Sequence, residues 1–194
     1  MSRWVPFETL AAEPPWPLGR ELAVAGRCRG ALLRDWAAHV ARRAGSDAVT
    51  RLRAQVGIPP ELLPDAPRAD AWYPIAYQIA LTRAIVDVAL DGDILGLEPL
   101  LAEDTARAKD KILLFALRML GPRHLLERTT KTHAWLYDAG RAEAEVGQAS
   151  VQLAFEGAEF FANPTWRVLQ VFALRGMLTG FRKTITELAA DLDG

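Results

Sequence analysis

Residues 72–90, WYPIAYQIALTRAIVDVAL, are the most apolar stretch of the chain and constrain its fold more than any other feature. Apolar side chains recur there at helical spacing on two separate stripes. A helix that is apolar on two sides has to be covered by other elements. We therefore predict a central helix over 72–90, with Trp72 buried where a helical body meets a sheet. The stripes consist of Ile75, Ile79, Val86 and Leu90, and of Leu81, Ile85 and Val88.

Four further segments carry helical periodicity and complete the predicted helical body. A Pro-rich loop over 57–70 connects the one that ends at Val56 to the central helix. A short strand is predicted before them over 21–26, where apolar and other residues alternate. The four helices are expected over 29–44, ended by Gly45; over 46–56, capped by Ser46 or Asp47; over 99–120, opened by Pro99; and over 122–140.

After Gly140 the pattern changes from helical to alternating. Two strands are predicted over 143–148 and 151–155, turning near Gly147. Asn163 and Pro164 are residue types that favour the cap and the first turn of a helix, and they predict a helix over 166–178. Residues 181–192 favour a strand in their Thr-Ile-Thr part and a helix in their ELAADL part, so both assignments stay open. This order predicts an α+β fold with an N-terminal helical body packed on a small C-terminal antiparallel sheet.

The length of 194 residues predicts one domain. Residues 1–20 form a Pro-rich arm, and residues 21–194 form a single α+β domain. Because Trp4, Phe7 and Trp16 make the arm too apolar for a free tail, we expect it to pack on the domain. A partner-docking segment is the alternative for the arm.

The formal net charge of -1 argues against a strong electrostatic nucleic-acid binder. No stretch reaches the roughly 20 apolar residues that a membrane span needs, and no signal-peptide pattern is present. The single cysteine, Cys28, cannot form an internal disulfide. A cytoplasmic protein is therefore expected. Arg27, Arg29 and a nearby helix start would lower the pKa of the Cys28 thiol, but a lone cysteine is more often a small buried apolar residue.

Several short motifs resemble a myxobacterial paralogous family whose domain has no assigned function. They are Gly26-Arg27, the WYP of 72–74, the LGP of 120–122 and the LYDAG of 136–140. The resemblance runs from about Leu22 to the C-terminus. The family is distantly similar to heme-nitric-oxide-binding and vinyl-reductase-like ligand-sensing domains. This similarity implies a helical body against a small antiparallel sheet, and small-molecule sensing or signalling in place of catalysis.

The heme-binding relatives of that family use a helix histidine followed by a Tyr-x-Ser-x-Arg motif on a strand. His133 lies on about the corresponding helix, but the VQLAFEG of 151–157 lacks the motif. We therefore expect no cofactor, and His133 is predicted to be a core histidine bonded to a neighbour. The three histidines, His39, His124 and His133, show no metal-site spacing.

An acidic turn after the central helix matches part of an EF-hand calcium loop. Asp87, Asp91 and Glu98 occupy ligand positions 1, 5 and 12 of that loop. Positions 3 and 9 hold Ala89 and Leu95, so two oxygen donors are missing. An acidic glycine turn between helices accounts for the same residues, and we expect no metal site.

The sequence carries no phosphate-binding glycine loop and no nucleophile elbow. We therefore expect a non-enzymatic small-molecule-sensing or signalling domain that holds an apolar ligand between helices and sheet. The alternative is a protein–protein interaction module, a homodimer or a docking partner, without a ligand; an enzyme of unrecognised type is a third hypothesis. Core packing competes with ligand binding at each lining residue. The predicted ligand lining consists of Trp72, Tyr73, Tyr77, Phe115, Trp135, Phe155 and Trp166.

Overall fold

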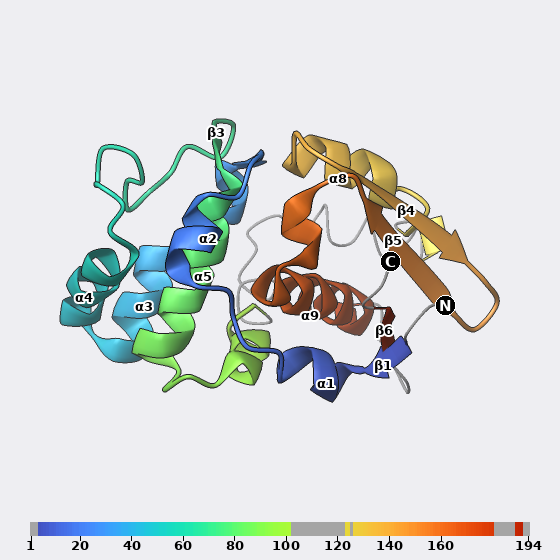
Figure 1. Ribbon diagram of the computed structural model, residues 1–194, viewed down its shortest axis with the longest axis horizontal. Coiled ribbons are helices and arrows are strands. Elements are labelled where there is room, and N and C mark those ends of the chain that lie inside the picture. The colour runs from blue at the N-terminus through green and yellow to red at the C-terminus, as the bar shows by residue number, and fades with distance from the viewer. Residues whose placement is uncertain (1–3, 102–122, 125, 181–188, 192–194) are drawn as a thin grey trace.

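The structure is a computed structural model that describes residues 4–101, 123, 124, 126–180 and 189–191 (Figure 1). Helices dominate the N-terminal part of the chain, and the described strands form only small antiparallel pairs, which confirms the predicted α+β class. The α-helices are α1 (Phe7–Ala11), α2 (Leu18–Leu22), α3 (Trp36–Ala44), α4 (Ser46–Val56), α5 (Ile75–Ala89), α8 (Thr129–Leu136) and α9 (Pro164–Gly180). The strands are β1 (Trp4–Pro6), β2 (Arg27–Arg29), β3 (Trp72–Pro74), β4 (Arg141–Val146), β5 (Val151–Glu156) and β6 (Ala189–Asp191). Short 3-10 turns are η1 (Gly30–Leu32), η2 (Ile94–Gly96) and η3 (Glu159–Ala162).

Helix α5 is the central element, as its two apolar stripes predict. It packs against α2, α3, α4 and α9, and nine of its fifteen residues are buried. It begins at Ile75, however, and the predicted start at Trp72 is wrong. The reason lies in Pro74, whose ring disfavours a helical conformation in the residue before it. Residues 72–74 instead form strand β3.

The segment before the helical body differs from its predicted strand over 21–26. Helix α2 ends at Leu22, and strand β2 begins only at Arg27. Gly26 separates them with a φ of +103°, a conformation that glycine adopts readily. Strand β2 pairs antiparallel with β3, so that Cys28 lies opposite Tyr73. The helix expected over 29–44 is correct only from Trp36, because η1 and a turn precede it.

The remaining helices of this part follow their sequence signals. Helix α4 covers the predicted range, and it buries Ala48, Leu52 and Val56, which are spaced four residues apart. Its N-cap is Gly45 without a side-chain hydrogen bond, so the predicted cap at Ser46 or Asp47 is wrong.

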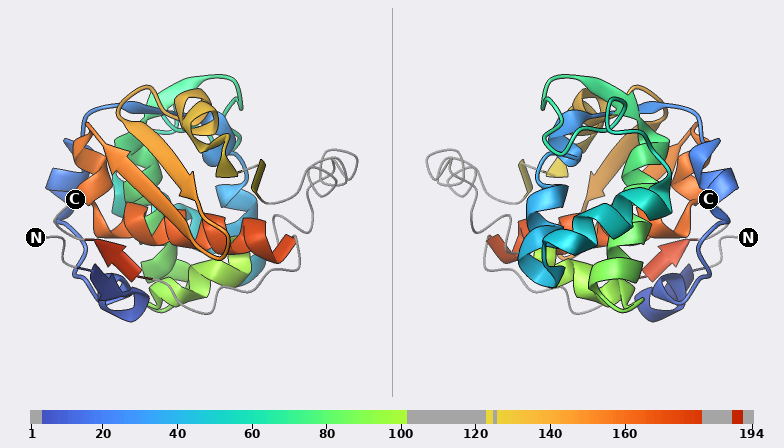
Figure 2. Two further views of the ribbon diagram at one scale, coloured as in Figure 1. Left: turned by 90° about the vertical axis from the view of Figure 1, so that its right-hand side faces the viewer. Right: turned by 90° about the vertical axis from the view of Figure 1, so that its left-hand side faces the viewer.

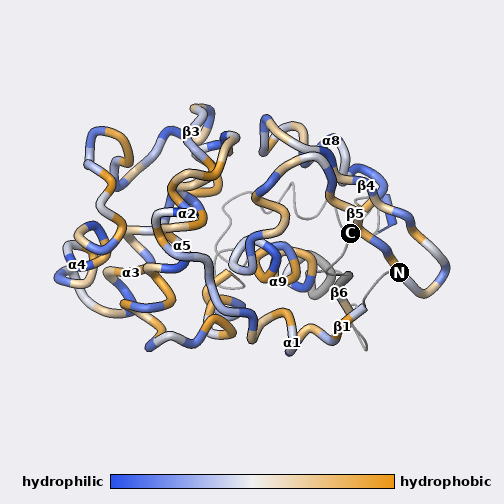
Figure 3. The backbone as a smooth tube through the Cα atoms, viewed as in Figure 1, coloured by the Kyte–Doolittle hydropathy of each residue, from blue (hydrophilic) through white to orange (hydrophobic). Residues whose placement is uncertain are grey.

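The predicted helix over 99–120 lies mostly outside the described residues; its described part, 99–101, belongs to a helical stretch that begins at residue 97. In Figure 3, hydrophobic and hydrophilic bands alternate along α3 and α5, as expected for helices with a buried face.

The predicted hairpin is confirmed. Strands β4 and β5 pair antiparallel from Arg141 opposite Glu156 to Val146 opposite Val151. The turn closes where the Gly147 N–H donates to the Ser150 carbonyl, at 2.9 Å. Helix α8 packs beside β4. The hairpin and α8 lie on the same side of the molecule, which faces the viewer on the left of Figure 2.

Helix α9 starts as its cap signal predicts. The Asn163 side-chain oxygen accepts a hydrogen bond from the Trp166 N–H at 3.0 Å, and Pro164 occupies the first turn. The helix continues to Gly180, two residues beyond the predicted end at Leu178. Of the ambiguous segment 181–192, Ala189–Asp191 is strand β6, and residues 181–188 lie outside the described residues.

The N-terminal arm packs on the domain, as expected, but it contains more regular structure than its prolines predict. Strand β1 pairs antiparallel with β6, so the two ends of the described chain meet (Figure 1). Phe7 and Leu10 of α1 are buried, and the Phe7 ring meets Phe172 edge-on at 5.7 Å. The arm thus closes a second, smaller apolar core against α9, distinct from the larger core around α3, α4 and α5.

Candidate functional site

The seven predicted lining residues are not brought together in one place. Phe155 and Trp166 are in contact, with ring centroids 5.1 Å apart in an edge-on arrangement. Trp135 lies on the outer surface of α8 and is 58% exposed. Phe115 lies outside the described residues. Tyr77 is half-buried against the larger core.

Trp72 and Tyr73 lie on β3, away from the hairpin. Trp72 is half-buried, in contrast to the expected full burial, and the Arg29 guanidinium lies 4.0 Å from its ring centroid. Its place on a strand next to β2, with arginines over the ring, explains why it stays partly open to solvent. The Tyr73 hydroxyl accepts a hydrogen bond from the Arg68 N–H at 3.2 Å. Both residues therefore have structural roles that do not depend on a ligand.

Around Trp166 the chain gathers six aromatic rings, which we call the aromatic cluster. Trp166 is 1% exposed and lies 5.3 Å from Phe160 and 4.9 Å from Phe161 by ring centroids. Aromatic pairs of this kind stabilise a core by about 0.5 to 1.5 kcal/mol beyond burial of their area. The cluster consists of His133, Tyr137, Phe155, Phe160, Phe161 and Trp166.

His133 is a core histidine, as predicted. Its ring stacks on Tyr137 at 4.9 Å, and its Nε2 lies 3.2 Å from the Ala139 carbonyl. Burial lowers the pKa of His133, and the backbone contact to Ala139 opposes that shift. The neutral ring therefore packs with the aromatic cluster at neutral pH.

Beside the aromatic cluster lies a buried carboxylate that sequence reasoning missed. Glu21 of α2 is 0% exposed, and the Arg83 Nη1 atom lies 3.6 Å from its Oε2. Burial raises the pKa of Glu21, while Arg83 and the Asn163 side chain lower it. Arg83 also donates to the Trp16 carbonyl, which ties the arm to α5.

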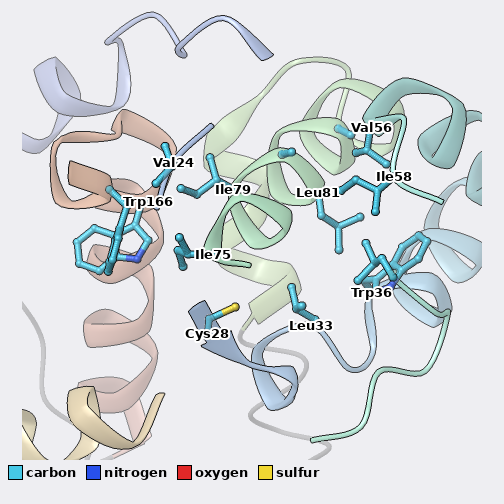
Figure 4. Packing of buried hydrophobic residues seen from close by; sticks show 14 of the residues in the cluster. Val24, Cys28, Leu33, Trp36, Val56, Ile58, Ile75, Ile79, Leu81 and Trp166 are labelled. Atoms are coloured by element: carbon cyan, nitrogen blue, oxygen red, sulfur yellow. The ribbon is translucent and has the colours of Figure 1, made fainter. Parts of the chain in front are cut away.

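Several buried polar atoms at this place make no hydrogen bond of normal geometry among the described residues. They nevertheless lie near polar neighbours: Arg83 and the Asn163 side chain are close enough to the Glu21 carboxylate to lower its pKa, and the Gln78 and Trp166 side chains lower the pKa of Tyr137. A buried donor or acceptor that lacks a well-formed hydrogen bond costs up to about 1 to 3 kcal/mol, so each such group calls for an explanation. Figure 4 shows Trp166 facing Val24, Ile75 and Ile79 across the junction of α9 with α5. The atoms are both Glu21 carboxylate oxygens, Gln78 Oε1, Asn163 Nδ2 and Trp166 Nε1.

These residues, with Arg83 and Tyr137, form a linked set that we call the junction site. The Glu21 carboxylate faces Asn163 and Arg83, and Asn163 caps the turn that carries Trp166. The buried Tyr137 hydroxyl accepts a hydrogen bond from the Gln170 side-chain amide at 3.5 Å. Burial raises the pKa of Tyr137 to about 12. The site therefore joins α2 and α5 of the helical body to η3 and α9.

A sequence signal for the junction site does exist. In the predicted central helix, Gln78, Thr82 and Arg83 interrupt an otherwise apolar run. Polar residues in a helix that is covered on all sides have to meet polar partners. Glu21 gives no comparable signal, because its burial depends on contacts with residues far away in the sequence.

Cys28 is buried, as the favoured interpretation predicts. Strand β2 places it at 0% exposure opposite Tyr73, and a bridge links it to Tyr137. Burial raises the pKa of the Cys28 thiol to about 12, so the lowering expected from its arginine neighbours is wrong. The side chain of Arg27 is directed instead to Asp138, 2.5 Å away.

Two of the three acidic residues of the partial calcium loop bind other side chains instead of pointing to a common site. Asp87 lies on α5 and accepts a hydrogen bond from Gln55 Nε2 at 2.6 Å. Glu98 pairs with Arg175 at 3.2 Å. Asp91 adopts a φ of +52° in the turn. Within the described ranges, no three His, Cys, Asp or Glu side chains are grouped to hold a metal ion.

Among the described helices, none is long and apolar enough to cross a lipid bilayer. Comparisons of the chain with protein-family models, with curated proteins and with solved structures find no match.

Proposed function

We propose that this chain is a non-enzymatic sensing domain that holds a small, largely apolar molecule at the junction site. The observation that carries the proposal is the set of buried polar atoms on Glu21, Gln78, Asn163 and Trp166 that make no hydrogen bond of normal geometry among the described residues. Ligand sites are mostly apolar with a few convergent polar groups, and they often lie where elements meet. The resemblance to ligand-sensing domains supports the same class of function.

The available atoms define the chemistry of such a ligand. Trp166 Nε1 and Asn163 Nδ2 donate hydrogen bonds, whereas the Glu21 oxygens and Gln78 Oε1 accept them. Because Arg83 already balances the Glu21 charge, a neutral ligand with both a donor and an acceptor fits better than an ion. The aromatic cluster supplies apolar contacts for the rest of the molecule.

A binding role also agrees with the titratable groups near the site. The raised pKa of the Cys28 thiol leaves it protonated at neutral pH, so it is a poor nucleophile. The neutral His133 is engaged with Ala139 and with aromatic rings. These features favour recognition over covalent chemistry.

Native mass spectrometry of the gently purified chain tests the proposal. We expect a non-covalent mass that is released on denaturation, and that is reduced in Trp166→Phe, which removes Nε1 and keeps most of the ring. Trp36→Phe is the matched control, because Trp36 Nε1 also makes no hydrogen bond in its buried position, but Trp36 lies on α3 in another region of the same core. A wild-type chain without any bound mass, or equal losses in the two variants, contradicts the proposal.

A further inference from the structure

We propose that the outer face of α8 and the hairpin forms an interface between two copies of this chain. The observation behind it is charge complementarity between two neighbouring parts of one surface. The basic part is a face of α8, and the acidic part is the outer face of β4. The proposal goes beyond the ligand site and does not depend on it.

The basic part is built on the helix face opposite the buried His133. Arg128, Lys131 and Trp135 are spaced three and four residues apart, so they share one side of the helix. All three are exposed, and Trp135 at 58% is a large apolar side chain in solvent. Neither Arg128 nor Lys131 makes an ion pair within the described part of the chain, whereas the nearby Glu127 is already held by Arg123 at 2.8 Å.

The backbone at Trp135 is held in place by the fold. The Arg29 Nε atom donates to the Trp135 carbonyl at 3.2 Å, and the same guanidinium lies over the Trp72 ring. This contact fixes the end of α8 against β2. An exposed tryptophan beside cations that have no ion pair among the described residues is a typical feature of a protein–protein interface.

The acidic part consists of every second residue of β4, on the exposed face of the strand. Ala142 is buried, whereas Glu143 and Glu145 are exposed on the opposite face of the strand. Across the hairpin, Gln152, Ala154 and Glu156 share that exposed face. Arg141 lies on the same face, pairs with Glu156 and also attracts Glu143. Glu143 and Glu145 have no direct ion pair in the described ranges, so this face keeps a net negative charge opposite to that of the α8 face.

A two-fold arrangement satisfies both parts at once. In an isologous dimer, the basic helix of each copy meets the acidic strand of the other, and the contact occurs twice. The ribbons of α8 and the hairpin lie on the same side of the molecule in the left view of Figure 2, and α8 packs beside β4. Because β4 and β5 pair only with each other among the described strands, a second copy would cover the outer face of a two-stranded hairpin.

A charge-swap experiment on the full chain tests this assignment by sedimentation equilibrium at low salt. The wild type is expected to be a dimer. Arg128→Glu with Lys131→Glu, and separately Glu143→Lys with Glu145→Lys, should each weaken self-association by at least about tenfold, because like charges then face each other. An equimolar mixture of the two variants should restore the dimer, since every contact in the mixed pair is again attractive. Trp135→Ala should also weaken the wild-type dimer.

The matched control is Arg51→Glu with Glu61→Lys, which changes exposed charges on and after α4, at the other end of the molecule (Figure 1), and should leave the dimer unchanged. Circular dichroism melting verifies that each variant is folded. A wild-type monomer over micromolar concentrations overturns the proposal. Folded variants that dimerise as the wild type does, or that stay monomeric when mixed, also overturn it.

Discussion

Two regions of the larger core each bury a tryptophan, Trp36 in one and Trp166 in the other, but the regions differ in the polar groups around the ring. Trp36, 4% exposed, packs with Leu33, Leu81 and Ile58 (Figure 4), and its ring is covered by a guanidinium, that of Arg53, 5.1 Å away. That arginine is itself bonded to the Leu63 carbonyl and to Asp65. The surroundings of Trp36 are thus apolar or satisfied, apart from its own indole N–H.

Trp166 lies in a different environment. Its neighbours are aromatic rings on one side and a buried carboxylate and two amides on the other, several atoms of which make no hydrogen bond of normal geometry among the described residues. A protein gains stability by filling such a place with apolar side chains, as it does around Trp36. Retaining polar groups at the junction site therefore indicates a requirement other than stability, and ligand recognition is the requirement that we propose.

The largest expected effect is that of Trp166→Ala. Truncation of a buried tryptophan costs about 3 to 5 kcal/mol, a large part of the roughly 5 to 15 kcal/mol that stabilises a domain. Because Trp166 also loses four ring contacts, we expect its unfolding free energy in urea to fall more than that of Trp36→Ala. If Trp166→Ala is the milder change, the aromatic cluster is loosely packed, and the contrast between the two regions of the core is wrong.

A smaller effect is expected from Trp72→Ala. The ring is half-buried on β3 and holds Arg29 at 4.0 Å, so we expect a loss of about 1 to 2 kcal/mol from burial and the cation–π contact. Trp4→Ala should be milder still, because Trp4 is 53% exposed. Urea denaturation of the three variants checks the order Trp166, Trp72, Trp4. A Trp72→Ala chain as unstable as Trp166→Ala would show that β3 is part of the essential core.

The same contrast explains what could be predicted from the sequence. Helices α4 and α5 and the β4–β5 hairpin carry their periodicity within a few consecutive residues, so local patterns identified them. The pairing of β1 with β6 joins residues near both ends of the chain through only three positions a strand, which no local pattern specifies. Of the predicted lining, Phe155 and Trp166 meet, whereas Trp72 and Trp135 lie elsewhere, since aromatic composition alone does not determine which side of an element faces inward.

The dependence of stability on pH distinguishes the effect of the buried carboxylate of Glu21 from that of the buried His133. The raised pKa of Glu21 means that its contribution to stability is complete below about its ordinary value of 4.5 and is lost as pH rises through the folded-state pKa. The lowered pKa of His133 has the opposite consequence: stability falls as pH drops below its ordinary value of 6.5, until the folded histidine is also protonated.

Glu21→Gln should therefore raise the unfolding free energy relative to wild type more at pH 8 than at pH 4.5, whereas the loss of stability below pH 6.5 caused by His133 should remain. Urea midpoints at pH values from 4.5 to 8 provide the measurement. A glutamine variant that is less stable at high pH would show that the attraction between Glu21 and Arg83 outweighs the cost of burying the charge.

The smallest expected effect is that of Ca²⁺. A site with a dissociation constant of about 10⁻⁶ M would add roughly 4 kcal/mol at millimolar Ca²⁺. Asp87 and Glu98 are instead bonded to Gln55 and Arg175, so we expect almost no change in melting temperature.

The Glu98–Arg175 pair joins the turn after α5 to α9, the helix that carries Trp166. Glu98→Ala should lower stability by up to about 1 kcal/mol, equally with and without Ca²⁺, because the pair is partly exposed. A Ca²⁺-dependent rise of many degrees that Glu98→Ala abolishes would contradict both the missing donors and the structural role of this pair.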